Sequence, residues 1–428
     1  MSYFSYKNGV LHAENVALTA ISQQFGSPTY VYSKAALVAN FSAYADACKQ
    51  HSSKPDGALI CYSVKSNSNL AVLQLLNQLG SGFDIVSGGE LLRVIAAGGD
   101  PAKVIFSGVG KSRQEMRLAL SHDILCFNVE STAELHRLNE VAGSMGKRAA
   151  ISLRVNPNVD AKTHPYISTG LKENKFGVAY DEALPCYRTA AALPHIDVVG
   201  IDCHIGSQLL DDAPMLEALD KLIELVDQLA GEGIQLHHLD IGGGIGITYD
   251  DEQPVAIADY LGRLFARINA WRQEKYQGVP IKVMFEPGRS IVGNAGVLLT
   301  EIQYLKHSEA KNFAVVDAAM NDLMRPALYE AWHDVKTVSQ RSTTAQTYDV
   351  VGPVCESGDW LARARSLAVE AGDLLALMSA GAYGMTMSSN YNTRGRAAEV
   401  MVDGAQVHLI RQRENPADLF ALESVISP

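Results

Sequence analysis

The segment that decides the fold reads Ala58-Leu59-Ile60-Cys61-Tyr62-Ser63-Val64-Lys65-Ser66-Asn67 and leads into Leu70-Ala71-Val72-Leu73-Gln74-Leu75-Leu76. The apolar run 58–62 is typical of a buried strand, and the run 70–76 is typical of a helix that packs against it. Lys65 stands where this strand ends. Because an unpaired ammonium is costly to bury, Lys65 needs a carboxylate partner, a path to water, or a role as an amine that forms a Schiff base.

The same strand–helix pattern recurs along the chain. Further β-rich runs occupy residues 82–86, 104–107, 124–127, 149–155, 198–203, 236–241 and 281–285, and each except the last precedes a plausible helix. Eight strands that alternate strictly with helices predict an α/β fold of the (β/α)8 TIM-barrel type rather than an open doubly wound sheet. We expect this barrel to span residues 31–285.

The pattern changes after the barrel. Strand-like segments follow without amphipathic helices between them, at residues 296–305, 312–317, 348–351, 374–378 and 400–409. The first 30 residues are also extended and rich in turn residues. Since 428 residues exceed what one hydrophobic core usually supports, we predict a second, mostly β domain made of residues 1–30 and 286–428 that completes the active site.

Composition excludes several classes of protein. The net charge of −11 argues against a nucleic-acid or anionic-membrane surface. The six cysteines are scattered without a Cys-x-x-Cys pair or a Cys/His cluster, so neither a metal site nor a disulfide framework is indicated. The N-terminus lacks the layout of a secretory signal, and no apolar stretch approaches the ~20 residues of a membrane span. We expect a cytoplasmic protein with a small-molecule substrate.

Chemically useful side chains stand at the predicted carboxyl ends of the barrel strands. In such barrels this is where active sites form. We therefore expect one shared site at the barrel mouth, formed by Lys65, Asp84, Ser107, Asn156, His204, Gly242, Gly243, Gly244 and Glu286.

The glycine run Gly242-Gly243-Gly244 follows a predicted strand and leads toward a helix. Its bare backbone amides could wrap a phosphate, and Ser207 could add a hydroxyl donor. A plain turn is the alternative. The run is not a dinucleotide-binding motif, because the G-x-G-x-x-G spacing fails and the context is a barrel.

Two residues of the mouth suit a pyridine ring. A lone histidine on an apolar strand is more often a core residue, but at the mouth the flat imidazole of His204 could stack on a cofactor ring. Glu286, in Glu286-Pro287-Gly288-Arg289, could keep a pyridine nitrogen protonated and so strengthen the ring as an electron sink. Together with Lys65 and the glycine run, these residues describe a site for pyridoxal 5'-phosphate.

Later residues suit a substrate that carries a carboxylate. Arg289 and Arg325 could present two guanidinium groups to it, although either arginine alone would more often form a surface ion pair. Cys355 follows a predicted strand, and its thiol could be inert packing, a reactive thiol or a proton donor. From this motif alone, inert packing is the favoured alternative.

As a set, these blocks closely resemble the diaminopimelate decarboxylases, a family in the alanine racemase-like (fold type III) group of pyridoxal phosphate enzymes. The resemblance covers nearly the whole chain. Ser63 and Ser66 depart from it, because alanine is frequent at these positions. The matching blocks are Tyr62-Ser63-Val64-Lys65-Ser66-Asn67, Ser168-Thr169-Gly170 through Lys175-Phe176-Gly177, His204-Ile205-Gly206-Ser207-Gln208, the glycine run, Glu286-Pro287-Gly288-Arg289, Cys355-Glu356 and Gly381-Ala382-Tyr383-Gly384.

The resemblance implies a role for each site residue. Lys65 would carry the cofactor as a Schiff base, His204 would stack on its ring, and Cys355 would return a proton to the α-carbon. Cys355 and Glu356 would reach the pocket across a homodimer interface. The other implied cofactor contacts are Asp84, Ser207, Gly242, Gly243, Gly244, Glu286, Gly288, Arg289 and Tyr383, and the implied substrate contacts are Arg289, Arg325, Tyr329, Glu356 and Tyr383.

The implied activity is decarboxylation of meso-2,6-diaminopimelate to L-lysine and CO₂, the last step of lysine biosynthesis. Relatives that act on ornithine or arginine bind a distal cation, which Arg325 would repel. Carboxynorspermidine decarboxylase remains a rival, because its substrate also carries a carboxylate. Racemization is disfavoured, since Glu286 makes the ring a stronger electron sink than racemases of this fold use. A non-catalytic relative would have lost Lys65, Cys355 or the glycine run, and all are present.

Overall fold

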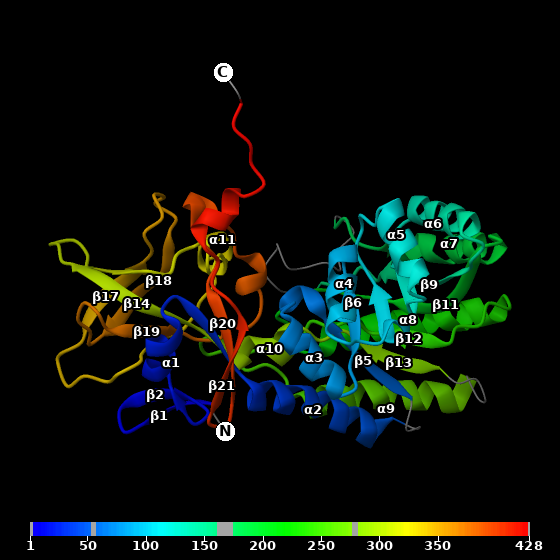
Figure 1. The fold of residues 1–428 in the computed structure, drawn as a ribbon. Helices are drawn as coiled ribbons and strands as arrows, with labels where there is room; N and C mark the ends of the chain where they lie inside the picture. Colours follow the sequence, from blue (N-terminus) through cyan, green and yellow to red (C-terminus); the bar gives the residue numbers. More distant parts are fainter. Residues whose placement is uncertain (1–2, 53–56, 161–173, 276–280, 427–428) are drawn as a thin grey trace. The chain divides into compact units, whose positions relative to one another are not determined.

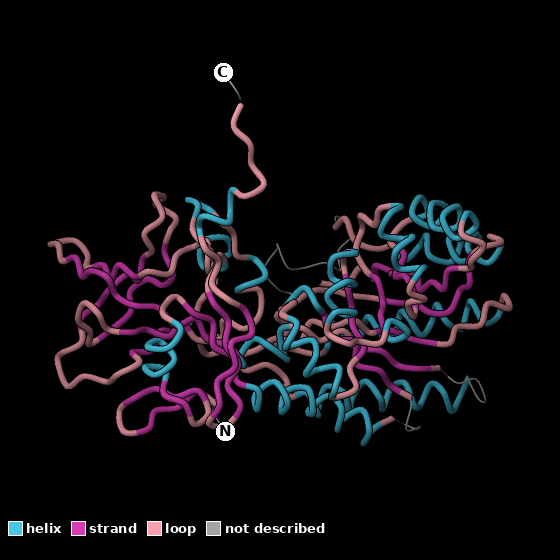
Figure 2. Tube along the Cα trace, in the orientation of Figure 1, coloured by secondary structure: helices cyan, strands magenta, loops and turns pink. Residues whose placement is uncertain are grey.

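The structure, a computed structural model, describes residues 3–52, 57–160, 174–275 and 281–426. Contacts within the chain divide it into two compact units. The barrel unit comprises Asn40–Ile247 and Gln253–Ser290, and the β unit comprises Met1–Ala39, Thr248–Glu252 and Ile291–Pro428. Figure 1 colours most of the barrel unit from blue to green, and Figure 2 shows that helices accompany its strands whereas strands predominate in the β unit.

The barrel unit confirms the predicted fold. Within the described ranges, eight parallel strands pair in the order β9-β11-β12-β13-β5-β6-β7-β8, and pairing between β8 and β9 closes the barrel. A two-residue strand, β10 (Val178–Ala179), pairs with β9 at its end. The barrel strands are β5 (Ala58–Ser63), β6 (Gly82–Ile85), β7 (Val104–Phe106), β8 (Cys126–Val129), β9 (Ala149–Asn156), β11 (Ile196–Asp202), β12 (His238–Asp240) and β13 (Lys282–Phe285).

Helices lie between successive barrel strands, and one more precedes the first barrel strand, β5. Serine side chains begin three of them: Ser87, Ser112 and Ser131 each accept a hydrogen bond from a backbone N–H three residues on. Such N-caps are each worth about 1 kcal/mol. The helices are α2 (Lys34–His51), α3 (Leu70–Gln78), α4 (Gly88–Ala96), α5 (Arg113–Ser121), α6 (Thr132–Ser144), α7 (Tyr180–Ala192), α8 (Ala213–Gly231) and α9 (Ile257–Lys275). None of the helices in the described ranges has the length and apolar character that a membrane crossing requires.

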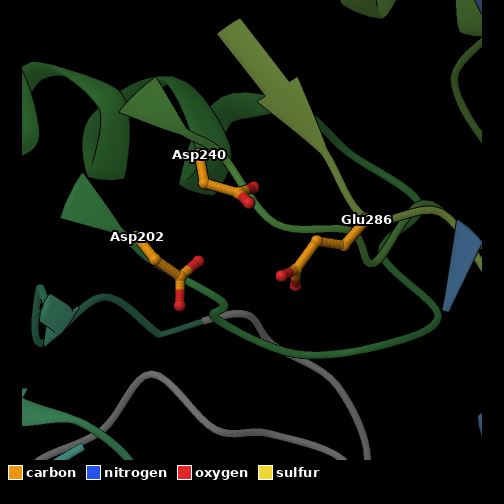
Figure 3. A group of neighbouring side chains, drawn as sticks. All are labelled: Asp202, Asp240 and Glu286. Carbon is orange, nitrogen blue, oxygen red and sulfur yellow. The ribbon is translucent and has the colours of Figure 1, made fainter. Parts of the chain in front are cut away.

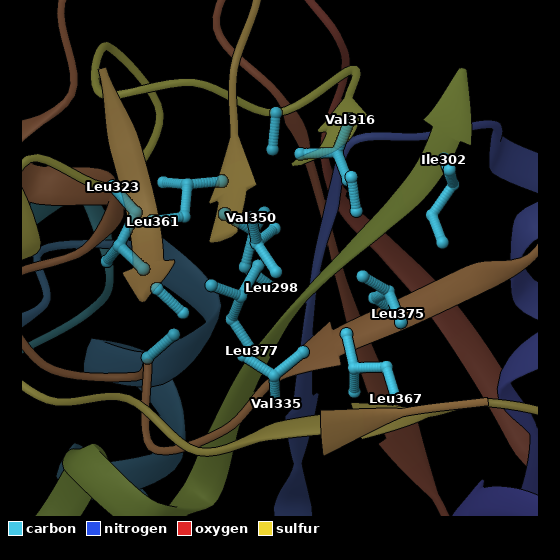
Figure 4. Packing of buried hydrophobic residues seen from close by; sticks show 14 of the residues in the cluster. Leu298, Ile302, Val316, Leu323, Val335, Val350, Leu361, Leu367, Leu375 and Leu377 are labelled. Atoms are coloured by element: carbon cyan, nitrogen blue, oxygen red, sulfur yellow. The ribbon is translucent and has the colours of Figure 1, made fainter. Parts of the chain in front are cut away.

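The β unit is built on a second sheet, in which β14 is central. This long strand pairs with β4, β15 and β19, and aliphatic side chains from Leu298, Val350, Leu375 and their neighbours form the core on the sheet (Figure 4). The strands of this sheet are β4 (Thr29–Ser33), β14 (Gly296–Lys306), β15 (Phe313–Val316), β16 (Val335–Thr337), β17 (Gln346–Val351), β18 (Trp360–Leu367), β19 (Leu374–Leu377), β20 (Ala398–Asp403) and β21 (Gln406–Arg411).

Smaller elements complete the chain. The strands β1 (Phe4–Lys7), β2 (Val10–Ala13) and β3 (Val16–Ala17) form a separate three-stranded sheet. The short helices α1 (Leu18–Phe25) and α11 (Arg325–Tyr329) belong to the β unit, and α10 (Arg289–Val292) begins at the last residues of the barrel unit.

The structure differs from the sequence-based expectations in several elements of the β unit. The run 400–409 is a hairpin rather than one strand, because Gly404 takes a left-handed φ of +60° and reverses the chain between β20 and β21. The strands β16 and β18 had no counterpart in the prediction. The expected boundary after residue 30 falls inside β4, whereas the whole of β4 pairs with β14 and β20 of the β unit. Contacts likewise place residues as far as Ser290 in the barrel unit.

Candidate active site

Lys65 lies in the one-turn helix η1 (Val64–Ser66) directly after β5. Its Nζ is 2.6 Å from Oδ2 of Asp84 on the neighbouring strand β6, and the Ser63 hydroxyl donates to the same oxygen at 2.9 Å. The Asp84 side chain is fully buried, while that of Lys65 is 32 % exposed. The strand-end amine therefore has a carboxylate partner and also an approach from solvent.

Glu90, at the start of α4, is a second acid close enough to interact with the amine. Burial raises the pKa of Glu90 to about 7, although a hydrogen bond from the Val86 N–H and the positive charge of Lys65 oppose the rise. A carboxyl with a pKa near neutrality can gain or lose a proton during a reaction. Glu90 was not predicted from the sequence, because a glutamate in the first turn of a helix is ordinary.

Glu286 follows β13 and is one of three buried carboxyls that point toward one another (Figure 3). Oxygens of Glu286, Asp202 and Asp240 all lie within 4.8 Å of one another. Burial raises the pKa of Asp202 to about 7, although the positive charge of Arg154 opposes the rise. Burial, and then the neighbouring negative charges, raise the pKa values of Asp240 and Glu286 well above their usual range. Three carboxylates this close cannot all be ionised at neutral pH, so the group keeps at least one proton.

Asn128 donates a hydrogen bond to the side-chain carboxyl of Glu286. Its amide Nδ2 lies 3.3 Å from Oε1 of Glu286 and 3.1 Å from the Ser107 hydroxyl. The hydrogen bond from Asn128 to Oε1 orients the Glu286 carboxyl, and Oε2 can then bind a different group. Glu286 can thus hold or release a proton at a fixed place in the barrel.

His204 lies beside Glu286 as a neutral ring. Burial lowers the pKa of His204 well below its usual value, and the positive charges of Arg154 and Lys65 lower it further. The Gly243 N–H donates to Nδ1 at 3.2 Å, so Nδ1 accepts and the ring proton is on Nε2. The 3.9 Å separation of Nδ1 from Glu286 is therefore not an ion pair, and the flat, uncharged imidazole is compatible with stacking on an aromatic ring.

The glycine run packs too closely on the backbone for any other residue. A Cβ at Gly243 would overlap the carbonyl oxygen of Glu286, and a Cβ at Gly244 would lie 2.5 Å from the carbonyl oxygen of Gly206. Gly242 and Gly244 also have left-handed φ values of +71° and +121°. The run therefore lies against both the Glu286 block and the His204 block.

Arg289 contacts Ser207, and Gly288 packs against Ser63 and Ser66. The Arg289 guanidinium donates from Nε and Nη2 to the Ser207 hydroxyl at 3.1 and 3.0 Å, and Arg289 is 6 % exposed. A Cβ at Gly288 would lie 3.0 Å from both Ser63 Cβ and Ser66 Oγ. The two serines that depart from the family pattern thus pack directly on the Glu286-Pro287-Gly288-Arg289 block.

The barrel unit therefore brings most of its sequence-predicted residues into one connected group, while Asn156, the last residue of β9, donates to the Phe176 carbonyl at 3.5 Å. Several of their partners were not predicted from the sequence, although a polar side chain in the last residues of a strand was the available signal. Arg154 lies inside the predicted strand 149–155. It pairs with Glu130 at 3.3 Å and donates to the His204 carbonyl at 3.4 Å. Asn128 lies one residue beyond the predicted end of its strand. The matching block Ser168-Thr169-Gly170 lies outside the described residues.

The other predicted residues lie in the β unit. Arg325 begins α11 and Tyr329 ends it, while Tyr383 has a left-handed φ of +56° in the turn after β19. Cys355 is exposed in the turn after β17, which excludes packing in a core as its role. Its N–H donates to Asn392 at 3.3 Å. A hydrogen bond to Glu356 raises the pKa of the neighbouring Tyr391 phenol.

Comparison with known proteins agrees with this geometry. The family described as "Pyridoxal-dependent decarboxylase, pyridoxal binding domain" matches residues 38–293. Diaminopimelate decarboxylase of Pseudomonas aeruginosa is 59 % identical over 426 residues, which cover 100 % of each chain. The crystal structure of diaminopimelate decarboxylase from Helicobacter pylori complexed with L-lysine is 42 % identical with a TM-score of 0.88, covering 95 % of this chain and 99 % of that one. The crystal structure of diaminopimelate decarboxylase from M. jannaschii in co-complex with L-lysine is 37 % identical with a TM-score of 0.93, covering 99 % of this chain and 98 % of that one.

Proposed function

This chain belongs to the diaminopimelate decarboxylase family of pyridoxal-dependent decarboxylases, and we propose that it converts meso-2,6-diaminopimelate to L-lysine and CO₂, the last step of lysine biosynthesis. The observation that carries this proposal is the connected group at the barrel strand ends. In it, a lysine amine paired with Asp84 lies in the same network as a buried, proton-holding Glu286 and a neutral His204.

The residues present fit pyridoxal 5'-phosphate. The Lys65 amine can bind an aldehyde covalently, the Glu286 carboxyl can share its proton with a ring nitrogen, and the uncharged face of His204 can stack on an aromatic ring. The amides of Gly242–244 and the guanidinium of Arg289, oriented by Ser207, suit a phosphate. Asp84, Gly288 and Tyr383 complete the proposed cofactor contacts.

The cofactor, when bound, supplies the electron sink that accepts the electron pair of the broken C–C bond. The chain's own residues do the rest. Glu286 would bind the ring nitrogen and share a proton with it, because burial and the adjacent carboxyls raise the pKa of Glu286 and leave a proton on this group of carboxyls. Asp84 balances the charge of Lys65 whenever that amine is free and protonated. Cys355, whose thiol is exposed, would return a proton to the α-carbon after CO₂ leaves.

Substrate selection requires that one carboxylate be kept while another leaves. We assign the retained carboxylate to Arg289 and Arg325, because a guanidinium matches a carboxylate with two parallel hydrogen bonds. Tyr329, Glu356 and Tyr383 are the further proposed contacts. Because Cys355 is exposed and adjacent to Glu356, both suit a pocket completed across a homodimer interface. All six cysteines are unpaired, which suits a cytoplasmic enzyme.

The purified protein should absorb as a Schiff base that borohydride bleaches. It should also release CO₂ from meso-2,6-diaminopimelate and form lysine in equal amount. Carboxynorspermidine, offered in parallel, tests the rival substrate. A larger kcat/KM for carboxynorspermidine than for diaminopimelate would contradict the proposed substrate while leaving the cofactor assignment intact.

A further inference from the structure

Arg325 is held by two buried aromatic residues of the β unit that our sequence analysis did not single out. Its Nη1 lies 2.9 Å from Nε2 of His333, and its guanidinium carbon lies 4.5 Å from the centre of the Tyr249 ring. The His333 ring meets the Tyr249 ring edge-on, with centroids 5.4 Å apart and an interplanar angle of 81°. His333 is completely buried, and Arg325 is 7 % exposed.

Hydrogen bonding defines the protonation of His333. A guanidinium only donates, so Nε2 must accept from Arg325. A carbonyl oxygen only accepts, so Nδ1, which lies 2.8 Å from the Met378 carbonyl, must carry the ring proton. His333 is therefore a neutral imidazole whose lone pair points at the guanidinium.

The backbone of His333 is anchored as well. Arg365 Nη2 donates to the His333 carbonyl at 3.1 Å, and the Arg365 guanidinium stacks 3.1 Å from the centre of the Trp332 ring. With its ring bonded at Nδ1 and its backbone bonded at the carbonyl, His333 cannot move without breaking several contacts. The Nε2 acceptor is thus held in one position, and it orients the Arg325 guanidinium that donates to it.

These contacts restrict the plane of the Arg325 guanidinium. His333 takes an N–H of Nη1, and Tyr249 covers a face of the guanidinium, so neither contact uses the edge formed by Nε and Nη2, which can pair with a carboxylate. A guanidinium that is already oriented loses less conformational entropy when it binds. An arginine without such contacts would bind the same carboxylate more weakly.

We propose that His333 and Tyr249 are positioning residues that hold Arg325 in the orientation in which it recognises the carboxylate retained from the substrate. This inference rests on the proposed function, because it takes Arg325 as the residue that reads that carboxylate. It predicts selectivity for ligands that carry the carboxylate over ligands of the same length that lack it.

The test compares two competitive inhibitors of the holoenzyme. L-Lysine keeps the carboxylate, whereas 1,5-diaminopentane has the same chain without it. His333→Phe keeps a flat ring but removes the acceptor, so the inhibition constant of lysine and the KM of diaminopimelate should rise about tenfold, the effect of about 1.4 kcal/mol. The inhibition constant of 1,5-diaminopentane and kcat should change less than about twofold. His333→Gln restores an acceptor and should recover most of the loss.

Two further variants keep the test decisive. His307→Phe is the matched control, because His307 is an exposed histidine that also meets a tyrosine ring edge-on, at 5.8 Å from Tyr348, and it should change neither inhibition constant. Tyr249→Leu removes the ring over the guanidinium without removing the hydrogen bond. It should weaken lysine selectively even if His333→Phe does not fold.

Equal weakening of both inhibitors by the folded variants would overturn the inference, as would unchanged inhibition by lysine. A loss of kcat with both inhibition constants unchanged would also overturn it. Failure of the proposed function is a different result, since the unmodified enzyme would then release no CO₂ from diaminopimelate.

Discussion

The Lys65 ammonium lies 2.6 Å from the buried Asp84 carboxylate. The Ser63 hydroxyl donates to the same oxygen at 2.9 Å. This arrangement gives the amine a partner without enclosing it, since about a third of the Lys65 side chain is exposed. A lysine that served only to neutralise Asp84 would not need that exposure. We therefore treat Lys65 as the amine that binds the cofactor.

Replacing Lys65 with alanine should leave the fold intact and remove the covalent link to the cofactor. The colour of the protein should then be lost on dialysis, and borohydride should trap no adduct. Lys49→Ala, a change at an exposed lysine of α2, is the control and should retain the absorbance band. An adduct trapped on another lysine of the Lys65→Ala protein would disprove the assignment.

Glu286→Gln should lower kcat about 10²-fold or more while the protein keeps its cofactor, because a buried electrostatic partner of the transition state has been removed. Asp240→Asn is the matched control: it removes a carboxyl of the same group and keeps an oxygen that can accept from the Gly242 N–H. It should lower kcat much less. Equal losses in the two variants would show that the total charge of the group matters rather than Glu286 itself.

The strand ends of the barrel were predictable because strands and helices alternate strictly along the chain. Apolar residues recur every two positions in a strand and about every 3.6 positions in a helix, so local sequence distinguishes the two elements. The same reading placed Lys65, His204 and Glu286 at one mouth, since parallel strands in a barrel end on the same side. The partners of these residues were not predictable. The contacts of Asn128 with both Glu286 and Ser107 depend on the pairing of strands that are distant in sequence.

The β unit was harder to predict for the same reason. Tyr32 of β4 pairs with Gly296 of β14, and nothing in either segment specifies so distant a partner. The three residues of β16 are too few to show a period. His333 was missed because it stands in a segment without regular structure after α11, where no pattern separates a buried histidine from an exposed one.

The raised pKa of Asp202 makes stability depend on pH. Its pKa is about 7 in the folded protein against 3.8 for an ordinary aspartate, so between these values the folded state binds more protons than the unfolded state. The resulting stabilisation is complete below about pH 3.8 and is lost as the pH rises through 7. The free energy of unfolding should therefore fall with pH in this window, by at most about 1.4 kcal/mol per pH unit for this proton.

Asp202→Asn should flatten that decline. The variant also relieves Asp240 and Glu286, whose pKa values are raised partly by the charge of Asp202. Urea unfolding at pH 5 and pH 7, at equal cofactor occupancy, measures the change. The same decline in the variant and the unmodified protein would mean that Asp202 is ionised throughout this range.

Arg325→Ala should greatly reduce kcat/KM for diaminopimelate, because removing one partner of a buried charged pair costs about 2–5 kcal/mol. Cofactor absorbance should survive, since Arg325 is not among the proposed cofactor contacts. Arg363→Ala is the matched control: Arg363 also stacks on an aromatic ring, 3.9 Å from the centre of Trp360. Arg289→Ala should lose turnover and also weaken cofactor binding. Unchanged kcat/KM in Arg325→Ala would show that another residue binds the carboxylate that the substrate retains.

Cys355 and Lys65 provide a test of the proposed homodimer. If Cys355 reaches the pocket of the other subunit, each pocket takes Lys65 from one subunit and Cys355 from its partner. Lys65→Ala and Cys355→Ala then remove residues that different subunits supply to the same pocket. A mixed dimer then has one pocket with both lesions and one with neither. Loss of a proton donor alone should cost about 10²–10⁴-fold, so each parent variant should be nearly inactive.

Mixing the two inactive variants under subunit exchange should restore activity. With free exchange of equal amounts, about half of the dimers are mixed and about a quarter of all pockets regain a complete set of residues, because the two pockets of a twofold dimer are equivalent. The recovered kcat should thus approach a quarter of the unmodified value, with KM unchanged. Mass-tagged subunits verify that exchange has occurred, and a mixture of Lys65→Ala with itself is the control. Verified exchange without recovery would mean that Lys65 and Cys355 of one pocket come from a single chain.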